Sequence, residues 1–372
     1  MATLSAVADT KDAREWALLP HRIHGARPGW TPPLKSDAVA ELDPRRNPFL
    51  RHAETRHLLL RENGRTVGRI AATVHPASNE GQGRRDVFFG FPVVEDHRRH
   101  LPTLLDACAE IGREWGMDTI AGPYNYWAGA ECGVLLDDHD RRTALFQPWN
   151  PPELGPSLEA LGFAVRSEMA AYEVPVIDLA PVRGLLRRAA DATAASTGVH
   201  TRRLRMKSYR SEMALIRELH AQAFSRDAEV TPYPEDVFAH MTGALRSIID
   251  PGLVLIAERQ GTPVGFAVTV PDAHELFARW GGRLGPFDVL RLPLDRRTVD
   301  GAVVLLAGAV PSAPMGVGHL LIADTLDALD RGGYGTMHST WVHREKSVMK
   351  ILLESHLGLA PDRRWAIYER VL

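Results

Sequence analysis

Two stretches of the chain follow the same plan: RHLLLRENGRTVGRIAATVHP runs from Arg56 to Pro76, and GLVLIAERQGTPVGFAVTVPD runs from Gly252 to Asp272. Each holds an apolar run, a polar turn with a glycine, and a second run that includes Val-Gly. Asn63-Gly64 is a strong signal for a two-residue hairpin turn, because both central residues of that turn need a positive φ. Gln260-Gly261 has the same place in the second stretch. The two stretches therefore predict two β-hairpins.

Each predicted hairpin is followed by a strand, a helix and another strand. DVFFGFPVV from Asp86 and GAVVLLAGAV from Gly301 predict the two strands, and apolar stripes at helical spacing predict the two helices, which end at Gly116 and at Gly332-Gly333. A plan that recurs at so long a period indicates tandem domains and not a solenoid. We predict a first domain at residues 1–178, a helical connector at 179–200 and a second domain at 201–372.

The order strand, two helices, three strands, helix, strand, helix and closing strands resembles the GNAT (GCN5-related N-acetyltransferase) fold. The stretches GWTPPLKSD, NPFLRHAE, GPYNYWAGAECGVLL and PWNPPELGPSLEALGF resemble a bacterial group of tandem GNAT-like proteins. This resemblance covers nearly the whole length. It implies an α/β fold with mixed sheets, two tandem acyl-CoA acyltransferase domains with an altered first copy, and acetyl-CoA or another acyl-CoA as co-substrate.

The stretch VPSAPMGVGHLL, from Val310 to Leu321, stands where GNAT enzymes wrap the pyrophosphate of acyl-CoA. A helix N-terminus presents unpaired N–H groups, and glycine lets the backbone approach phosphate oxygens. Gly316 and Gly318 match the two small positions of the family pattern, whereas Ala313 replaces its Arg or Gln. The alternative is a strand-to-helix corner without a ligand. The predicted acyl-CoA contacts are Ala309, Val310, Ala313, Met315, Gly316, Val317, Gly318 and His319.

The corresponding turn of the first copy, VVEDHRRHLP, has no glycine and carries Glu95 and Asp96 at the helix entrance. Carboxylates there cap the helix themselves and repel phosphate. The first copy is therefore predicted to be a poor acyl-CoA site and to serve as scaffold or substrate wall.

Two further family positions do not match. After the fifth strand, GNAT enzymes often carry an asparagine beside the pantetheine arm and a tyrosine that protonates the departing thiolate. Counting back from Gly358 places Ser347 and Glu354 there, and counting from Met349 places Lys346 at the first position. We keep Ser347 as a predicted acyl-CoA contact. A solvent-facing role is favoured for Glu354, since an acid needs a raised pKa to donate near neutral pH.

A base must remove the proton of the acceptor amine. Glu131 and His343 are the predicted catalytic residues, with Asp288 as another candidate base. Glu131 lies in NYWAGAECGVLL, a segment rich in Tyr, Trp and Asn, as ligand-contacting loops often are. Structural roles stay open for both: packing across the domain seam for this loop, and a hydrogen-bonded strand end for His343. The predicted substrate contacts are Tyr124, Asn125, Tyr233 and Tyr368, although a position in the core is favoured for Tyr368.

Composition limits the partners. Hydrophobic residues make up 45% of the 372 residues, charged residues 24%, and the formal net charge is −2. This balance gives no electrostatic reason to expect nucleic acid or an anionic membrane. The two cysteines, the absence of a secretory-type N-terminus and the absence of a long apolar run predict a cytoplasmic protein. The spacing of the sixteen histidines does not suggest a metal site.

Three hypotheses follow. The first is direct acyl transfer from acyl-CoA to the amine of a small molecule. The second keeps the transfer but takes the acyl group from an acyl carrier protein or an aminoacyl-tRNA, because Ala313 weakens the pyrophosphate pattern. The third is a non-catalytic protein that binds a metabolite or a partner. A monomer or a homodimer is expected in each case.

Overall fold

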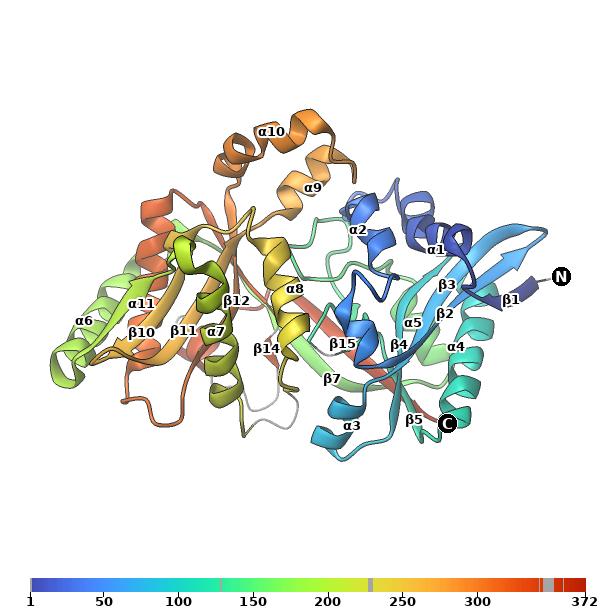
Figure 1. Cartoon of the computed structure of the whole chain (residues 1–372), viewed down its shortest axis with the longest axis horizontal. Helices are drawn as coiled ribbons and strands as arrows, with labels where there is room; N and C mark the ends of the chain where they lie inside the picture. The colour runs from blue at the N-terminus through green and yellow to red at the C-terminus, as the bar shows by residue number, and fades with distance from the viewer. Residues whose placement is uncertain (1, 128, 227–229, 341, 344–350, 357) are drawn as a thin grey trace.

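The computed structural model describes residues 2–372 except 128, 227–229, 341, 344–350 and 357, and it contains two mixed β-sheets (Figure 1). The first sheet has the strand order β1-β2-β3-β4-β5-β15-β7-β14, with β6 beside β15. Its strands are β1 (Ala2–Ala6), β2 (Glu54–Glu62), β3 (Arg65–Val74), β4 (Asp86–Val94), β5 (Thr119–Gly122), β6 (Val134–Leu135), β7 (Ala164–Ala171), β14 (Val342–His343) and β15 (Arg363–Val371).

The second sheet has the order β8-β13-β12-β11-β10-β9. Its strands are β8 (Glu173–Pro175), β9 (Val199–Arg203), β10 (Val254–Arg259), β11 (Thr262–Pro271), β12 (Gly301–Ala309) and β13 (Thr336–Ser339). In each sheet a hairpin is followed by an antiparallel third strand and a parallel fourth one. The predicted repeat of the architecture is confirmed.

Helices cover both sheets. With the first sheet lie α1 (Thr10–Ile23), α2 (Lys35–Ala40), α3 (Pro76–Gln82), α4 (His97–Glu114) and α5 (Leu154–Ala160). With the second lie α6 (Ala180–Thr197), α7 (Tyr209–Ala223), α8 (Glu235–Leu245), α9 (His274–Trp280), α10 (Pro286–Asp295) and α11 (Val317–Gly332). Short 3₁₀ or π turns span Pro48–Arg51, Val176–Leu179, Met206–Ser208, Pro251–Leu253, Arg296–Thr298 and Ile351–His356. Among the described residues, no helix has the length and apolar character needed to cross a membrane.

The two hairpin turns have the backbone that the sequence predicts. Asn63 and Gly64 have φ values of 51° and 78°, and Gln260 and Gly261 have φ values of 51° and 79°. Each pair closes a two-residue loop between paired strand ends, Glu62 with Arg65 and Arg259 with Thr262. Because type I′ turns follow the twist of their strands, they fix the register of both hairpins.

The two halves exchange strands. β15, the last strand of the chain, lies between β5 and β7 of the first sheet, and β8 from the first half pairs with β13 of the second sheet. The sequence placed residues 363–371 with the second domain, so this strand is a correction to that expectation. Pattern shows that a segment is a strand but not which sheet edge it completes. Trp365 and Tyr368 are almost fully buried there.

Candidate functional site

The fourth and fifth strands of the second copy separate, which leaves part of β12 without a neighbour. β12 and β13 pair in parallel only from Gly301 to Val304. Beyond this point, Thr340 donates to the carbonyls of Val304 and Leu305, and β12 continues to Ala309 with β11 as its partner. Within the described part of the chain, the other edge of β12 after Leu305 has no strand partner. Small residues at positions 307–309 line this free edge.

The free edge of β12 leads to the N-terminus of α11. The intervening loop is open: Pro311, Ser312 and His319 are exposed, and Met315 keeps 96% of its surface accessible. Val310 and Val317 are buried and anchor the two ends of the loop. In the part of the chain that the structure describes, no side chain caps α11.

The first-turn amides of α11 are available to a ligand. Those of Gly318 and His319 donate to no protein acceptor among the described residues. Unpaired amides at the start of a helix attract an anion through hydrogen bonds and the helix dipole. The loop therefore has the properties that the sequence predicted for a phosphate contact.

The two glycines of this loop have different roles. Gly316 has φ 94°, and a Cβ there would lie 2.3 Å from Oγ1 of Thr193 on α6. Gly316 is thus required by the backbone and by the packing of α6. Gly318 has open space around the position of a Cβ. Gly318 can therefore be substituted without a clash, and it is the better probe of ligand binding.

The N-terminus of α4 in the first copy is already satisfied. Asp96 accepts hydrogen bonds from the amides of Arg98 (2.9 Å) and Arg99 (3.1 Å), and Glu95 pairs with Arg22 and Arg65. A groove of about 1030 Å³ passes this turn, but Glu95, Asp96 and Glu153 line it. The same helix position thus carries carboxylates in the first copy and free amides in the second, as the sequence predicts.

Glu131 lies in a buried polar environment between the halves. Asn125 donates through Nδ2 to Oε2 of Glu131 at 3.3 Å and accepts through Oδ1 from the amide of Phe91 at 2.9 Å. Burial raises the pKa of Glu131, and the nearby His274 of α9 partly offsets this effect. A half-buried carboxylate with a raised pKa, held by a fixed amide, is a stronger base than an ordinary surface carboxylate and has the properties of a candidate general base.

A second carboxylate, which the sequence did not indicate, accompanies Glu131. Glu41 follows α2 and stays exposed, yet the surrounding protein and the charge of Glu131 raise its pKa to about 7. A negative charge on Glu131 therefore disfavours the charged form of Glu41.

A buried arginine lies in the same region of the first copy. Arg69 stacks on Trp16 at 4.1 Å and donates to the carbonyl of Trp16 at 2.8 Å, and burial lowers its pKa to about 9. Tyr126 also belongs here, with its hydroxyl 3.0 Å from Nε2 of His57. The sequence carried one signal for this residue: Arg69 is the charged residue in the otherwise apolar strand TVGRIAATV.

Tyr233 connects the second copy to the loop that carries Glu131. Its hydroxyl donates to the carbonyl of Gly129 at 3.3 Å, and its ring contacts Trp127 and His220, both at 5.1 Å between centroids. Burial raises the pKa of Tyr233 to about 12. The structure therefore brings Asn125, Glu131 and Tyr233, three of the predicted residues, to the seam between the halves.

Other predicted residues lie elsewhere. Tyr368 is 1% exposed in the core of the first sheet, where its hydroxyl donates to Glu159 at 3.0 Å; it has the core position favoured from the sequence and does not line an acceptor site. Tyr124 is buried against Phe88. The carboxylate of Asp288 accepts a hydrogen bond from the amide of Gly285 and so caps the start of α10, which is a structural role.

The segment after the fifth strand of the second copy is described only in part. His343 pairs with Met169 through its backbone in β14. Ser347 and Lys346 lie outside the described residues. Glu354 is half-buried and accepts a hydrogen bond from the hydroxyl of Tyr172 at 2.9 Å, so the expected solvent-facing position is wrong.

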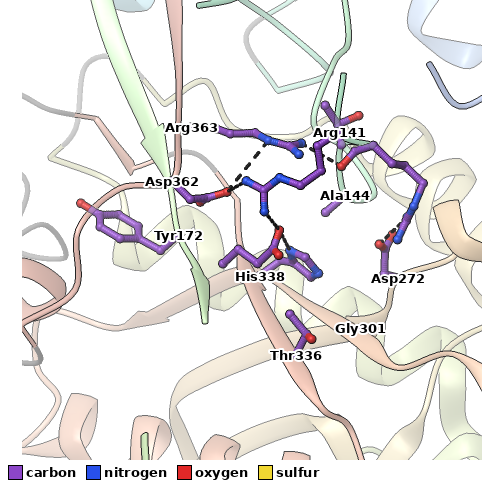
Figure 2. Close-up of polar contacts among 12 residues, drawn as sticks. Arg141, Ala144, Tyr172, Asp272, Gly301, Thr336, His338, Asp362 and Arg363 are labelled. Carbon is purple, nitrogen blue, oxygen red and sulfur yellow. Dashed lines mark hydrogen bonds and ion pairs between the residues drawn. The ribbon is translucent and has the colours of Figure 1, made fainter. Parts of the chain in front are cut away.

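A separate charged cluster joins the two sheets (Figure 2). Arg141 contacts Asp362 and Glu173 at 2.8 Å each, and Arg142 pairs at 2.8 Å with the fully buried Asp272. A cavity of about 390 Å³ lies beside these groups and His338. Because most charges here have opposite partners from the other half, the cluster serves to fix the halves together.

These features define a tandem GNAT fold, with an open loop in the second copy and a closed one in the first. No protein-family model matches the chain. A tandem GNAT protein from the clavulanic acid biosynthesis pathway superimposes with a TM-score of 0.59 at 14% identity, covering 100% of this chain and 98% of that one. The predicted fold class is confirmed.

Two curated proteins are similar to the chain over nearly its full length. One, called bacterial ceramide synthase, from Caulobacter vibrioides, is 27% identical over 97% of this chain and 95% of its own length. The other is protein YghO of Escherichia coli, 24% identical over 96% of this chain and 93% of its own length.

Proposed function

We propose that the protein is an acyl-CoA-dependent N-acyltransferase whose donor site lies in the second copy. The observation that carries the proposal is the contrast between the two helix starts: Asp96 occupies the amides of α4, while those of α11 are free at the end of an unpaired strand edge. The fold and the relative named as a ceramide synthase support acyl transfer as the general activity.

In the proposed reaction, Glu131 accepts a proton from the ammonium group of the acceptor. The freed amine attacks the thioester carbonyl carbon, backbone amides of β12 stabilise the oxyanion, and the C–S bond then breaks. The attacking nitrogen loses its second proton as the amide forms, and the departing thiolate takes up this proton and leaves as a thiol. Asn125 orients Glu131 through the 3.3 Å hydrogen bond.

We propose a primary amine on a long hydrocarbon chain as the acceptor. A ceramide is the amide of a fatty acid and a long-chain amino alcohol, and a relative over 97% of the chain carries that product in its name. Tyr126 and Trp127 of the loop that carries Glu131 pack with Tyr233 in one aromatic cluster, which makes the surroundings of Glu131 apolar.

The test is release of free thiol from acetyl-CoA and from long-chain acyl-CoA, with a short amine and a long-chain amino alcohol as acceptors, and mass spectrometry of the product. We expect an amide with an acyl-CoA donor, and faster turnover of the long-chain acceptor. Turnover with a charged acyl carrier protein alone would overturn the choice of donor. No acyl product with any of these donors would overturn the enzymatic proposal.

A further inference from the structure

The connection between the third and fourth strands of the second copy carries a helix pair that the first copy lacks. Residues 272–300 separate β11 from β12, whereas residues 75–85 separate β3 from β4. The longer connection forms α9 and α10. Figure 1 shows α10 at the outer edge of the molecule, beyond α9.

The polarity of α10 is inverted. Its outer face carries Phe287, Leu290 and Leu294, which are 80%, 76% and 62% exposed. The half-buried face instead carries Asp288, Leu292 and Asp295. A surface helix of a globular protein turns its apolar stripe inward, so this helix presents a surface suited to an apolar environment outside the protein.

Positive charges flank the apolar face. Arg291 lies on the exposed side, 3.7 Å from Asp295. Arg283 precedes α10 and Arg297 follows it, both are exposed, and neither has a carboxylate partner among the described residues. Arginines around an exposed apolar stripe are the pattern of a helix that lies in the interface of an anionic membrane, with apolar side chains among the acyl chains and guanidinium groups at the headgroups.

The same connection reaches the seam that contains Glu131. His274 of α9 lies close enough to act on the charge of Glu131. The turn after α9 contacts the first copy, where the amide of Lys35 donates to the carbonyl of Gly282 at 3.0 Å. The segment from α9 to α10 therefore connects the exposed face of α10 to the proposed acceptor site.

We infer that α10 docks the protein on an anionic lipid surface, where it takes a membrane-partitioned long-chain amine. The docking surface is Phe287, Leu290, Leu294, Arg283, Arg291 and Arg297. The lipid contact rests on the exposed apolar and basic residues; only the assignment of the amine rests on the proposed function. This inference replaces the expectation of no membrane partner, which came from the charge of the whole chain.

The test is co-flotation of the full chain with vesicles of phosphatidylcholine alone and of phosphatidylcholine with phosphatidylglycerol. We expect binding to the anionic vesicles, and on the order of ten-fold weaker binding for Phe287→Ser/Leu290→Ser/Leu294→Ser and for Arg283→Glu/Arg291→Glu/Arg297→Glu. The matched control, Ile177→Ser/Leu185→Ser, removes apolar residues that are 77% and 61% exposed elsewhere and should bind as the unchanged chain does.

Absence of vesicle binding by the unchanged chain, or equal loss in the control, would overturn the inference. A dimer that the triple serine variant dissolves would assign this face to a second copy instead. Turnover of a short soluble amine without vesicles distinguishes the two proposals. The triple serine variant should turn over this amine as the unchanged chain does. If the unchanged chain itself shows no turnover, that result contradicts the proposed function and not the lipid contact.

Discussion

At the scale of single residues, a small number of groups at the seam determine the protonation state of Glu131. Asn125 donates to this carboxylate, His274 favours its charged form, and burial together with Glu41 favours proton uptake in this region. The position of Glu131 between a fixed amide and a second carboxylate is what distinguishes it from an ordinary surface glutamate.

Replacing Glu131 with Gln is expected to lower kcat by roughly 10²–10⁴-fold, the usual contribution of a general base. Acyl-CoA affinity should not change, because the proposed donor site lies on β12 and α11. The pKa of Glu131 is raised, so the unchanged enzyme should lose activity as pH falls through that raised pKa and the base becomes protonated.

The pH–rate profile and single-turnover rates measure this effect. The matched control is Glu110→Gln, an exposed glutamate on α4, which should leave the rate and its pH profile unchanged. An unaltered rate in Glu131→Gln would remove this residue from the chemistry.

At the scale of elements, the exchanged strand joins the two halves. β15 is covalently part of the second half but completes the first sheet, where Trp365 is fully buried and donates to the carbonyl of Pro148 at 3.0 Å. The stability of the first sheet therefore depends on a segment at the far end of the chain.

The substitution Trp365→Ala is expected to lower the free energy of unfolding by about 3–5 kcal/mol, because it truncates a large buried aromatic side chain and leaves a cavity. Denaturant titration measures this change, and calorimetry should show that both halves respond. Val371→Ala alters the same strand at an 80% exposed residue and should stay within about 0.5 kcal/mol. Equal stability of the two variants would contradict the described role of β15.

At the scale of the whole molecule, the local patterns of the sequence predicted the repeated architecture. Turn chemistry at Asn63-Gly64 and Gln260-Gly261 depends on neighbours in the chain, and so does helical spacing. The partner of β15 depends on which sheet edge is open in space, which no local pattern records. Net charge is also blind to placement, because a value of −2 for 372 residues does not record the arginines around α10.

The site was predictable to the degree that its signals were local. The composition of the loop indicated Asn125 and Glu131, and the contrast between VVEDHRRHLP and VPSAPMGVGHLL indicated the difference between the helix starts. Glu41 and His274 gave no such signal, since their relevance arises only when the fold brings them near the loop of Glu131. A strand tyrosine can face a core or a ligand, and Tyr368 has the core position that its sequence context favoured.

The measurement that tests the central claim most directly is isothermal titration of acetyl-CoA and CoA into the unchanged chain, Gly318→Glu and Gly81→Glu. Both glycines have open space around a Cβ, so the variants should fold alike. A carboxylate at Gly318 should repel the diphosphate and weaken binding about ten-fold, or 1.4 kcal/mol, whereas Gly81→Glu in the first copy should bind as the unchanged chain does. Equal affinities in all three proteins, or no binding to the unchanged chain, would contradict the account.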